Sequence, residues 1–210
     1  MTGLIIGDGN LSNYTKSKTD LSLDYRIYID MSDLDFMHYI ERLFKSIIVT
    51  KSKLAPTKLH GNRKPRLRLQ IRNKGLFYFF VEKMGIPRGN KSSIVCVPKK
   101  IMSASIAVKN AFLTGYFDAD GGFRGGTLGF TSASHKLLQG VSSLLTENEI
   151  QHSEERWINK KYRKEFYGLR ISKKQIDTFL NRFSFQNKNK LDKISSRFFC
   201  GGAGVAKRDR

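Results

Sequence analysis

The chain has few cysteines and no cluster of metal-binding side chains. It contains 2 cysteines among 210 residues, Cys96 and Cys200, and neither belongs to a Cys-x-x-Cys pair or has a histidine nearby. This excludes a disulfide framework and a clustered zinc site, and it indicates a reducing, cytoplasmic environment. The 4 histidines are scattered through the sequence, which is typical of surface positions rather than of a metal centre.

Long apolar runs and acidic residues are also scarce. No apolar run approaches the ~20 residues that a membrane-spanning helix needs, and no signal peptide is visible. Lys and Arg number 38 against 18 Asp and Glu, so the formal net charge is +20 and the pI is about 10.1. Such an excess implies a polyanionic partner. Without an apolar segment, we expect nucleic acid rather than a membrane.

One short motif occurs twice, 112 positions apart. The copies are Thr2–Gly9 (TGLIIGDG) and Leu113–Gly121 (LTGYFDADG). Each copy places two small residues four positions apart, on one face of a helix; they are Gly3 and Gly7, then Gly115 and Ala119. A glycine inside a helix costs about 1 kcal/mol relative to alanine. We therefore expect these faces to form a close contact between two helices.

Each copy ends in Asp-Gly. Asp8 and Asp120 are predicted at helix C-termini, where the helix dipole disfavours a carboxylate. Gly9 and Gly121 follow at the position where a left-handed helix cap favours glycine. Two carboxylates brought together also repel each other, so stability alone does not select this arrangement. A bound Mg²⁺ would turn this repulsion into a net attraction between the cation and the two carboxylates. The motif pair therefore predicts a divalent-metal site.

Other loop motifs fit these residues poorly. An EF-hand loop starting at Asp118 needs an oxygen ligand, a glycine and a glutamate where the chain has Gly122, Phe123 and Gly129. A dinucleotide-binding fingerprint starting at Gly7 needs glycine at Ser12 and a preceding strand. A plain helix end remains a fair interpretation of either copy alone, but a poor one of both.

Both halves of the chain show the same order of predicted elements. The first has a motif helix, a strand over 24–30, a helix capped by Ser32 and reaching residue 48, a strand over 65–72, and a helix over 76–84 capped by Asn73. The second has a helix over 103–117, a strand over 127–131, a helix capped by Ser134, a strand pair at 157 and 166–172, and a closing helix around 176–180. This predicts an α+β fold of two αββαββα repeats with two antiparallel sheets. We expect repeats at 1–88 and 103–200, a linker at 89–102 and a basic tail at 201–210.

Basic residues concentrate on the predicted strands. Residues 51–74 contain 9 Lys and Arg and no acid, and residues 156–174 contain 8. Alternation with apolar residues would give each sheet one basic face, which suits the major groove of DNA. The predicted DNA contacts are Arg26, Tyr28, Arg66, Arg68, Gln70, Arg72, Lys74, Arg156, Lys160, Lys161 and Arg170.

On these residues the chain resembles the LAGLIDADG homing endonucleases, in particular the single-chain, two-repeat type encoded in archaeal introns. The resemblance implies a monomer whose two sheets form a saddle over a long asymmetric DNA site, and metal-dependent cleavage of both strands. Mg²⁺ or Mn²⁺ would support cleavage, and Ca²⁺ would bind without supporting it. Since the substrate would be DNA, we expect the protein to be cytoplasmic and associated with the nucleoid.

The resemblance also assigns roles to residues. Asp8 and Asp120 would bind metal, with the carbonyls of Gly7 and Ala119 completing its shell. The implied catalytic set is Asp8, Asp120, Arg124, Gln70, Arg170 and Lys173. The chain departs from the family after the second strand of each repeat, where relatives often have Gln-Lys and this sequence has Asp30-Met31 and Thr131-Ser132.

Two other functions remain open for such a scaffold. A splicing maturase would bind intron RNA without cleaving DNA, and a DNA-binding regulator would have lost catalysis. The aspartate present in both motif copies favours the nuclease over both.

Overall fold

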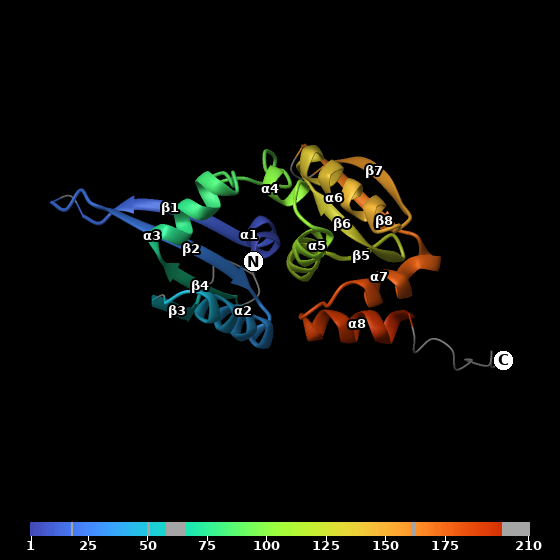
Figure 1. Ribbon diagram of the computed structural model, residues 1–210, viewed down its shortest axis with the longest axis horizontal. Coiled ribbons are helices and arrows are strands. Elements are labelled where there is room, and N and C mark those ends of the chain that lie inside the picture. The colour runs from blue at the N-terminus through green and yellow to red at the C-terminus, as the bar shows by residue number, and fades with distance from the viewer. Residues whose placement is uncertain (18, 50, 58–65, 161–162, 199–210) are drawn as a thin grey trace.

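Two repeats lie on either side of a central pair of helices, α1 (Thr2–Gly7) and α5 (Ile106–Asp120) (Figure 1). The computed structural model describes residues 1–17, 19–49, 51–57, 66–160 and 163–198. Each repeat contains one four-stranded antiparallel sheet, so the predicted α+β fold with two antiparallel sheets is confirmed.

The first repeat follows the predicted order. After α1 come β1 (Gly9–Thr15), β2 (Leu23–Met31), α2 (Leu34–Ile47), β3 (Lys51–Pro56), β4 (Leu67–Arg72) and α3 (Lys74–Tyr78), which continues as the π-helix η1 (Phe79–Lys83). The sheet order is β1-β2-β4-β3. Asn73 caps α3 as predicted, because its side chain accepts a hydrogen bond from the Leu76 amide. The cap of α2 is Asp33 rather than Ser32.

The second repeat has the same order with one helix added. It comprises α5, β5 (Gly122–Arg124), β6 (Thr127–Ser132), α6 (His135–Glu147), β7 (His152–Asn159), β8 (Lys164–Ile171), the 3₁₀ turn η2 (Lys173–Gln175) and α7 (Ile176–Arg182), followed by α8 (Lys188–Phe198). The sheet order is β5-β6-β8-β7, and Ser134 caps α6 as predicted. A short helix, α4 (Lys99–Met102), lies in the predicted linker.

Three features differ from the prediction. Helix α5 continues to Asp120 instead of ending near Phe117, so the whole second motif is helical. Helix α8 was not predicted, although Leu191, Ile194 and Phe198 have helical spacing and pack toward the core. Cys200 and the predicted tail at 201–210 lie outside the described residues.

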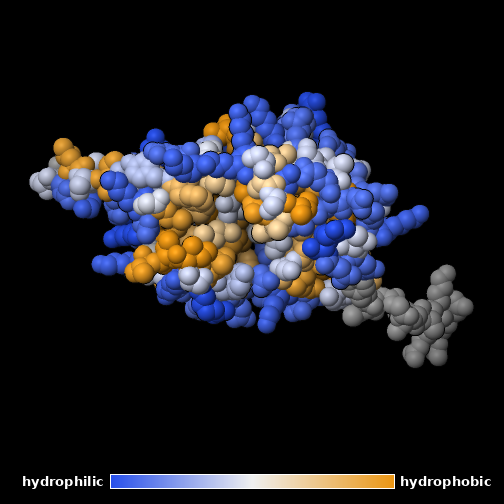
Figure 2. All heavy atoms as spheres, viewed as in Figure 1, coloured by the Kyte–Doolittle hydropathy of each residue, from blue (hydrophilic) through white to orange (hydrophobic). Residues whose placement is uncertain are grey.

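The motif helices are anchored by the cores of their own repeats. Ile5 is fully buried, and Phe117 packs against Phe130, Phe179 and Phe185 with ring centroids 5.5, 5.0 and 4.7 Å away. Hydrophilic residues cover the outer parts of the face seen in Figure 2, and apolar residues gather over the first repeat and near the centre. No described helix combines the length and apolar character that crossing a bilayer requires.

Candidate metal and nucleic-acid site

The backbones of α1 and α5 approach each other at the small residues of the two motifs. A Cβ at Gly3 would lie 2.2 Å from the Phe112 carbonyl oxygen and 2.5 Å from the Tyr116 nitrogen. At Gly7 it would lie 2.5 Å from the Ala119 Cβ. Only glycine therefore fits these points on α1, and the crossing brings the C-terminal ends of both helices together.

Gly9 and Gly121 have a different role from the one predicted. Neither is among the described glycines with positive φ, and Gly121 has φ −68°, so the predicted left-handed caps are wrong. A Cβ at Gly9 would lie 2.6 Å from the Ile5 backbone, and one at Gly121 would lie 2.1 Å from the Phe117 ring. Glycine is needed because each chain turns back tightly over its own motif helix.

Asp8 and Asp120 meet at this crossing and line one cavity of about 450 Å³. Burial raises the pKa of Asp8. Asp120 is exposed at the cavity surface, but desolvation by the cavity walls, with a smaller contribution from the Asp8 charge, raises its pKa to about 6. Neither carboxylate forms a hydrogen bond or ion pair with another described residue.

This donor set fits a divalent cation. Mg²⁺ binds through one or two carboxylates together with water and substrate phosphate, and it does not need a cage of protein ligands. Among the described residues no cluster of three or more Asp, Glu, His or Cys is present, so Asp8 and Asp120 are the acids on which such a site would depend. A cation between them would remove the repulsion that raises the pKa of Asp120.

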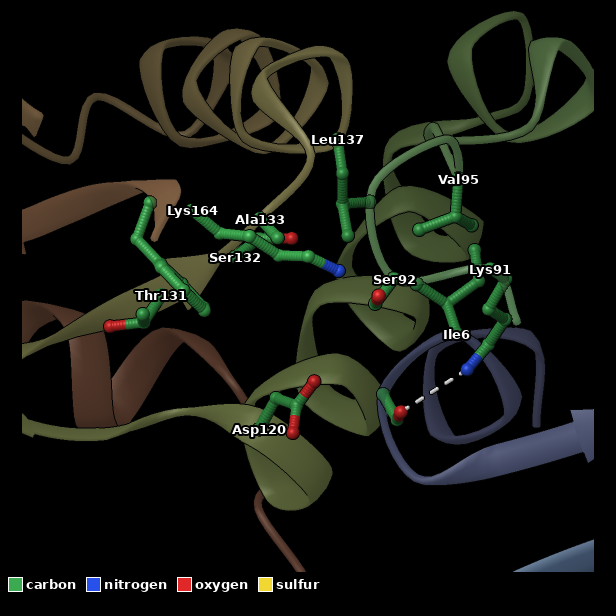
Figure 3. Close-up of a pocket in the computed structure, with 12 residues that line it drawn as sticks. Ile6, Lys91, Ser92, Val95, Asp120, Thr131, Ser132, Ala133, Leu137 and Lys164 are labelled. Carbon is green, nitrogen blue, oxygen red and sulfur yellow. Dashed lines mark hydrogen bonds between the residues drawn. The ribbon is translucent and has the colours of Figure 1, made fainter. Parts of the chain in front are cut away.

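Lys91 contacts the end of the first motif helix. Lys91 is 9% exposed, and its ammonium donates a hydrogen bond to the Gly9 carbonyl oxygen at 2.7 Å. It donates a second one, at 3.3 Å, to the Gly7 carbonyl oxygen (Figure 3). Burial lowers the pKa of Lys91, while Asp120 and Asp8 raise it. The lysine thus offsets both the helix dipole and the acid pair.

Lys190 contacts the C-terminal end of the second motif helix in the same way. Its ammonium donates hydrogen bonds to four carbonyl oxygens, at 2.7 Å to Phe117, 2.9 Å to Asp118, 3.2 Å to Ala119 and 2.7 Å to Gly121. Burial lowers its pKa, and Asp118, Asp8 and Asp120 raise it. The sequence analysis missed both lysines, because they are 2 of 38 cations and only the fold separates them from the rest.

Two cavities flank the acid pair. One, of about 440 Å³, is lined by residues that include Gly7, Lys91, Asp120, Thr131, Ser132 and Lys164 (Figure 3). The other contains Asp8, Arg66, Ala119, Asp120, Lys190 and Lys193. In both cavities an aspartate from one repeat lies beside the main chain that ends the other motif helix. Gly7 and Ala119 each line one of these cavities, and each carbonyl oxygen has a second lone pair besides the one that the lysine uses.

Four of the predicted catalytic residues do not line the cavities beside the acid pair, although Arg124 donates a 3.1 Å hydrogen bond to Thr131, which lines the first cavity. Arg124, Gln70, Arg170 and Lys173 line neither of these two cavities. Gln70 is opposite Tyr28 within the first sheet, and Lys173 is in η2 after β8. The cations that do line these cavities are Lys91, Lys190, Arg66 and Lys164, which arrive from segments that the motif does not include.

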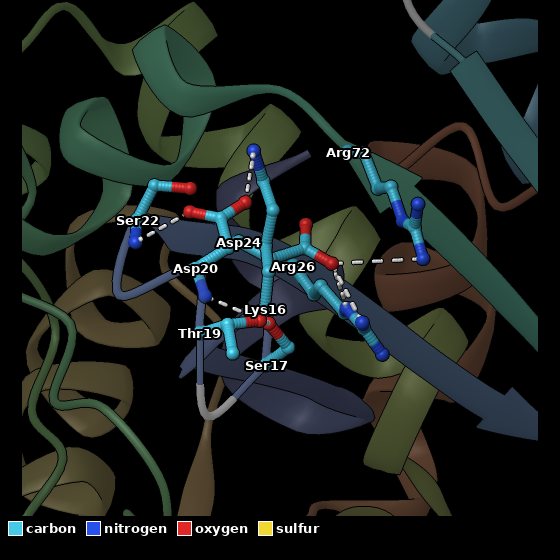
Figure 4. A network of polar contacts seen from close by, with 8 residues as sticks. All are labelled: Lys16, Ser17, Thr19, Asp20, Ser22, Asp24, Arg26 and Arg72. Atoms are coloured by element: carbon cyan, nitrogen blue, oxygen red, sulfur yellow. Dashed lines mark hydrogen bonds and ion pairs between the residues drawn. The ribbon is translucent and has the colours of Figure 1, made fainter.

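Five of the eleven predicted DNA contacts, namely Arg26, Arg68, Arg72, Arg156 and Arg170, form ion pairs with other described residues. Arg68 donates to both carboxylate oxygens of Asp30, its partner in strand register, at 2.6 and 2.7 Å, and its guanidinium lies 4.8 Å from the Tyr28 ring centroid. Arg26 and Arg72 share Asp24, at 2.6 and 3.5 Å (Figure 4). Ion pairing thus offsets part of the positive charge of the first sheet, while Lys51 and Lys53 of β3 remain exposed opposite Arg72 and Gln70.

The second sheet repeats this arrangement. Glu155 pairs with Arg124 and with Arg170, the latter at 2.5 Å, and Arg124 lies 3.7 Å from the Trp157 ring centroid. Arg156 pairs with Glu165. Elsewhere, Lys74 lies 5.7 Å from the Tyr25 ring centroid, Lys160 is exposed after β7, and Lys161 falls outside the described residues.

Comparison with known proteins identifies this arrangement. Residues 107–184 match the family model described as a LAGLIDADG-like domain. The chain is 28% identical over 194 residues to a replication factor C small subunit of Methanocaldococcus jannaschii, covering 91% of this chain and 10% of that protein. It is 32% identical over 111 residues to a probable translation initiation factor IF-2 of Thermococcus kodakarensis, covering 51% of this chain and 9% of that protein. The chain thus spans about a tenth of the length of these curated relatives.

Solved structures match most of the chain. The structure of I-DmoI in complex with DNA and Ca has a TM-score of 0.66 at 20% identity and covers 92% of this chain and 94% of its own. The structure of I-DmoI in complex with DNA and Mn has a TM-score of 0.62 at 22% identity, and the match covers 87% of this chain and 92% of that one. I-WcaI bound to its DNA recognition sequence gives 0.56 at 17% identity, with 94% and 83% covered.

The chain thus combines a two-repeat fold with a short motif that occurs once in each repeat. The chain carries a LAGLIDADG-like domain in its second repeat, and as a whole it has the fold of the two-domain LAGLIDADG homing endonucleases.

Proposed function

We propose that this chain is a site-specific DNA endonuclease that cuts both strands of a long asymmetric site with a divalent metal ion. The observation that carries the proposal is the meeting of Asp8 and Asp120 at the C-terminal ends of α1 and α5. Burial and mutual repulsion oppose this arrangement, and a cation together with a phosphodiester would offset both.

The chain's own residues have distinct tasks in such a reaction. Asp8 and Asp120 would hold the metal, with the carbonyls of Gly7 and Ala119 beside them. A bound cation would supply charge neutralisation at the phosphate and a water of lowered pKa. Lys91 and Lys190 keep the ends of the motif helices in place and add positive charge near the phosphate position. Arg66 and Lys164 enter the same cavities from the two sheets and would bind phosphate oxygens.

Mg²⁺ and Mn²⁺ are the cations that we expect to support cleavage, with Ca²⁺ binding without it. The substrate would be double-stranded DNA lying over the two sheets, bound by a monomer in the cytoplasm, on the nucleoid. The net charge of +20 supports a polyanionic partner, and the DNA-bound structures of I-DmoI and I-WcaI are consistent with that choice.

Selection from a random-site DNA library in Mg²⁺ would test the proposal, followed by cleavage of the selected site by Asp8→Asn and Asp120→Asn. Asparagine has nearly the same shape without the charge, so both variants should lose cation binding and cleavage of both strands. DNA binding in Ca²⁺, measured by gel shift, should persist. Glu147→Gln is a matched control, because it also removes a charge without changing shape, and that acid pairs with Lys109 outside both cavities.

Three results would contradict the proposal. Cleavage by either aspartate variant at the wild-type rate would move the chemistry away from this site. A wild-type chain that selects a DNA site but never cuts it would indicate a DNA-binding regulator. Tight binding of intron RNA without DNA cleavage would indicate a splicing maturase.

A further inference from the structure

We infer that Asp118, the first aspartate of the second motif copy, is a positioning residue that sets Lys190 against the metal site by holding the N-terminal end of α8. This inference rests on the proposed nuclease function for its consequence in catalysis. The juxtaposition itself rests on contacts within the chain. Asp118 lies outside the acid pair, and within the described part of the chain its carboxylate accepts hydrogen bonds from the segment before α8 rather than from either sheet.

Asp118 is almost fully buried, and both of its carboxylate oxygens accept hydrogen bonds from the segment before α8. Its side chain is 3% exposed. One oxygen accepts the Gln186 amide at 2.9 Å, and the other accepts the Asn187 amide at 3.1 Å. The Asn187 side chain returns a hydrogen bond to the Asp118 carbonyl oxygen at 3.3 Å. Two amides aimed at one buried carboxylate fix this segment relative to α5.

Asn187 carries this constraint into α8. Its side-chain oxygen accepts the Lys190 amide at 3.0 Å, and its carbonyl oxygen accepts the amides of Lys190 and Leu191 at 3.1 and 3.0 Å. These are the contacts of a helix N-cap. Lys190 therefore sits in the first turn of a helix whose start is bound to the motif helix that its ammonium contacts.

The first motif copy provides a natural contrast. The residue 112 positions before Asp118 is Ile6, which is 3% exposed and belongs to the apolar core. In that copy the lysine is Lys91, and it arrives from the segment between the repeats instead of from a helix. The second copy thus has a carboxylate, Asp118, at this motif position. In that copy helix α8 carries the lysine, Lys190, and its N-terminal end is bound by Asp118.

The first test measures the position of Lys190 without requiring cleavage. Lysine acetylation by acetic anhydride, followed by mass spectrometry, reports how well each amine is protected. In Asp118→Asn, one of the two backbone amides faces an amide group instead of an oxygen, so the start of α8 loosens. We expect Lys190 to be acetylated about fivefold faster than in wild type, because local opening exposes its amine. Lys91 should stay protected, and the exposed Lys193 should react fast in both proteins.

The second test is a double-mutant cycle on single-turnover DNA cleavage. We expect Asp118→Asn to slow cleavage by up to roughly 10²-fold, the effect of small displacements at reacting groups. Affinity for DNA in Ca²⁺ should remain close to wild type. If Asp118 acts through Lys190, Asp118→Asn should cause little further loss in a Lys190→Met background. Asn187→Ala, which removes the cap of α8, should reproduce both the labelling and the rate effects.

Asn73→Ala is the matched control, because it removes an equivalent side-chain cap from α3 in the other repeat. It should lower thermal stability as Asn187→Ala does, and it should leave Lys190 labelling and the cleavage rate unchanged. Unchanged Lys190 labelling in both Asp118→Asn and Asn187→Ala would overturn the inference. So would rate losses that multiply fully in the double mutant. A wild-type protein that cuts no DNA would overturn the proposed function instead, while the labelling would still decide the role of Asp118.

Discussion

Lys91 and Gly9 lie 82 residues apart in sequence, and the Lys91 ammonium donates a 2.7 Å hydrogen bond to the Gly9 carbonyl oxygen. Lys190 forms the equivalent bond, also at 2.7 Å, to Gly121, which occupies the matching position of the second motif copy. Both acid-bearing turns are thus held by a lysine from outside the motif, buried in the case of Lys91 and half-buried in the case of Lys190. Lys91 belongs to the segment between the repeats and Lys190 belongs to α8, so the two lysines are not equivalent positions of the sequence repeat. Their contacts with the motif turns are nevertheless equivalent.

Lys91→Met tests the first of these contacts. The change keeps most of the side-chain volume and leaves the carbonyl oxygens of Gly7 and Gly9 without their charged donor. We expect a loss of about 1.5–3 kcal/mol in the free energy of unfolding, the usual size for a hydrogen bond from a charged group. Urea denaturation measures it. Lys100→Met, at an exposed position of α4, should change stability little. Equal stability of the two variants would show that Lys91 does not support the turn.

Gly3→Ala tests the close helix contact. The new Cβ would overlap backbone atoms of α5, which cannot move without separating the helices. We expect destabilisation of about 1–3 kcal/mol, as for other overpacked sites. Gly75→Ala is the control, since its nearest contact is 3.5 Å away and alanine favours helix α3. That variant should be as stable as wild type or slightly more so, as thermal unfolding would show. Equal melting temperatures for both variants would contradict the observed crossing.

Asp120 should make stability depend on pH. Its pKa rises from an ordinary 3.8 to about 6 in the folded chain. The folded state therefore binds more protons than the unfolded state between these values, and stability falls as pH rises through that window. With a chelator present, Asp120→Asn should gain stability over wild type as the pH rises from 3.8 to about 6, and the gain should level off above that range. Cation binding to wild type should strengthen over the same range. A stability difference that stays constant from acid to neutral pH would contradict this assignment.

DNA affinity should depend steeply on salt. With about 6–10 phosphate contacts, a loss of roughly 10³–10⁵ in affinity is expected between about 50 and 200 mM salt. Glu155→Gln removes the acid shared by Arg124 and Arg170, so it should strengthen nonspecific binding and steepen the salt dependence. Glu147→Gln makes the same charge change at a pair with Lys109, outside the second sheet. Fluorescence anisotropy with random duplex DNA would compare them. Equal salt slopes would place Glu155 outside the DNA-binding face.

The sequence alone was sufficient for the doubled motif and the order of the repeats. Asp8 and Asp120 stand 112 positions apart, and Gly3 and Gly7 stand four positions apart within the first copy. These spacings need no tertiary information, because helix geometry alone determines which residues share a face. The caps at Asn73 and Ser134 were predictable for the same reason: a capping side chain contacts an amide only three residues away.

Only the tertiary structure decided which cations surround the acid pair. Lys91, Lys190, Arg66 and Lys164 converge from four separate segments, and no periodicity in the sequence relates them to Asp8 or Asp120. The strand arginines were correctly placed on sheets, but only strand register shows that Arg68 pairs with Asp30. A local pattern determines helices, strands and caps, whereas burial and long-range register determine which charges meet.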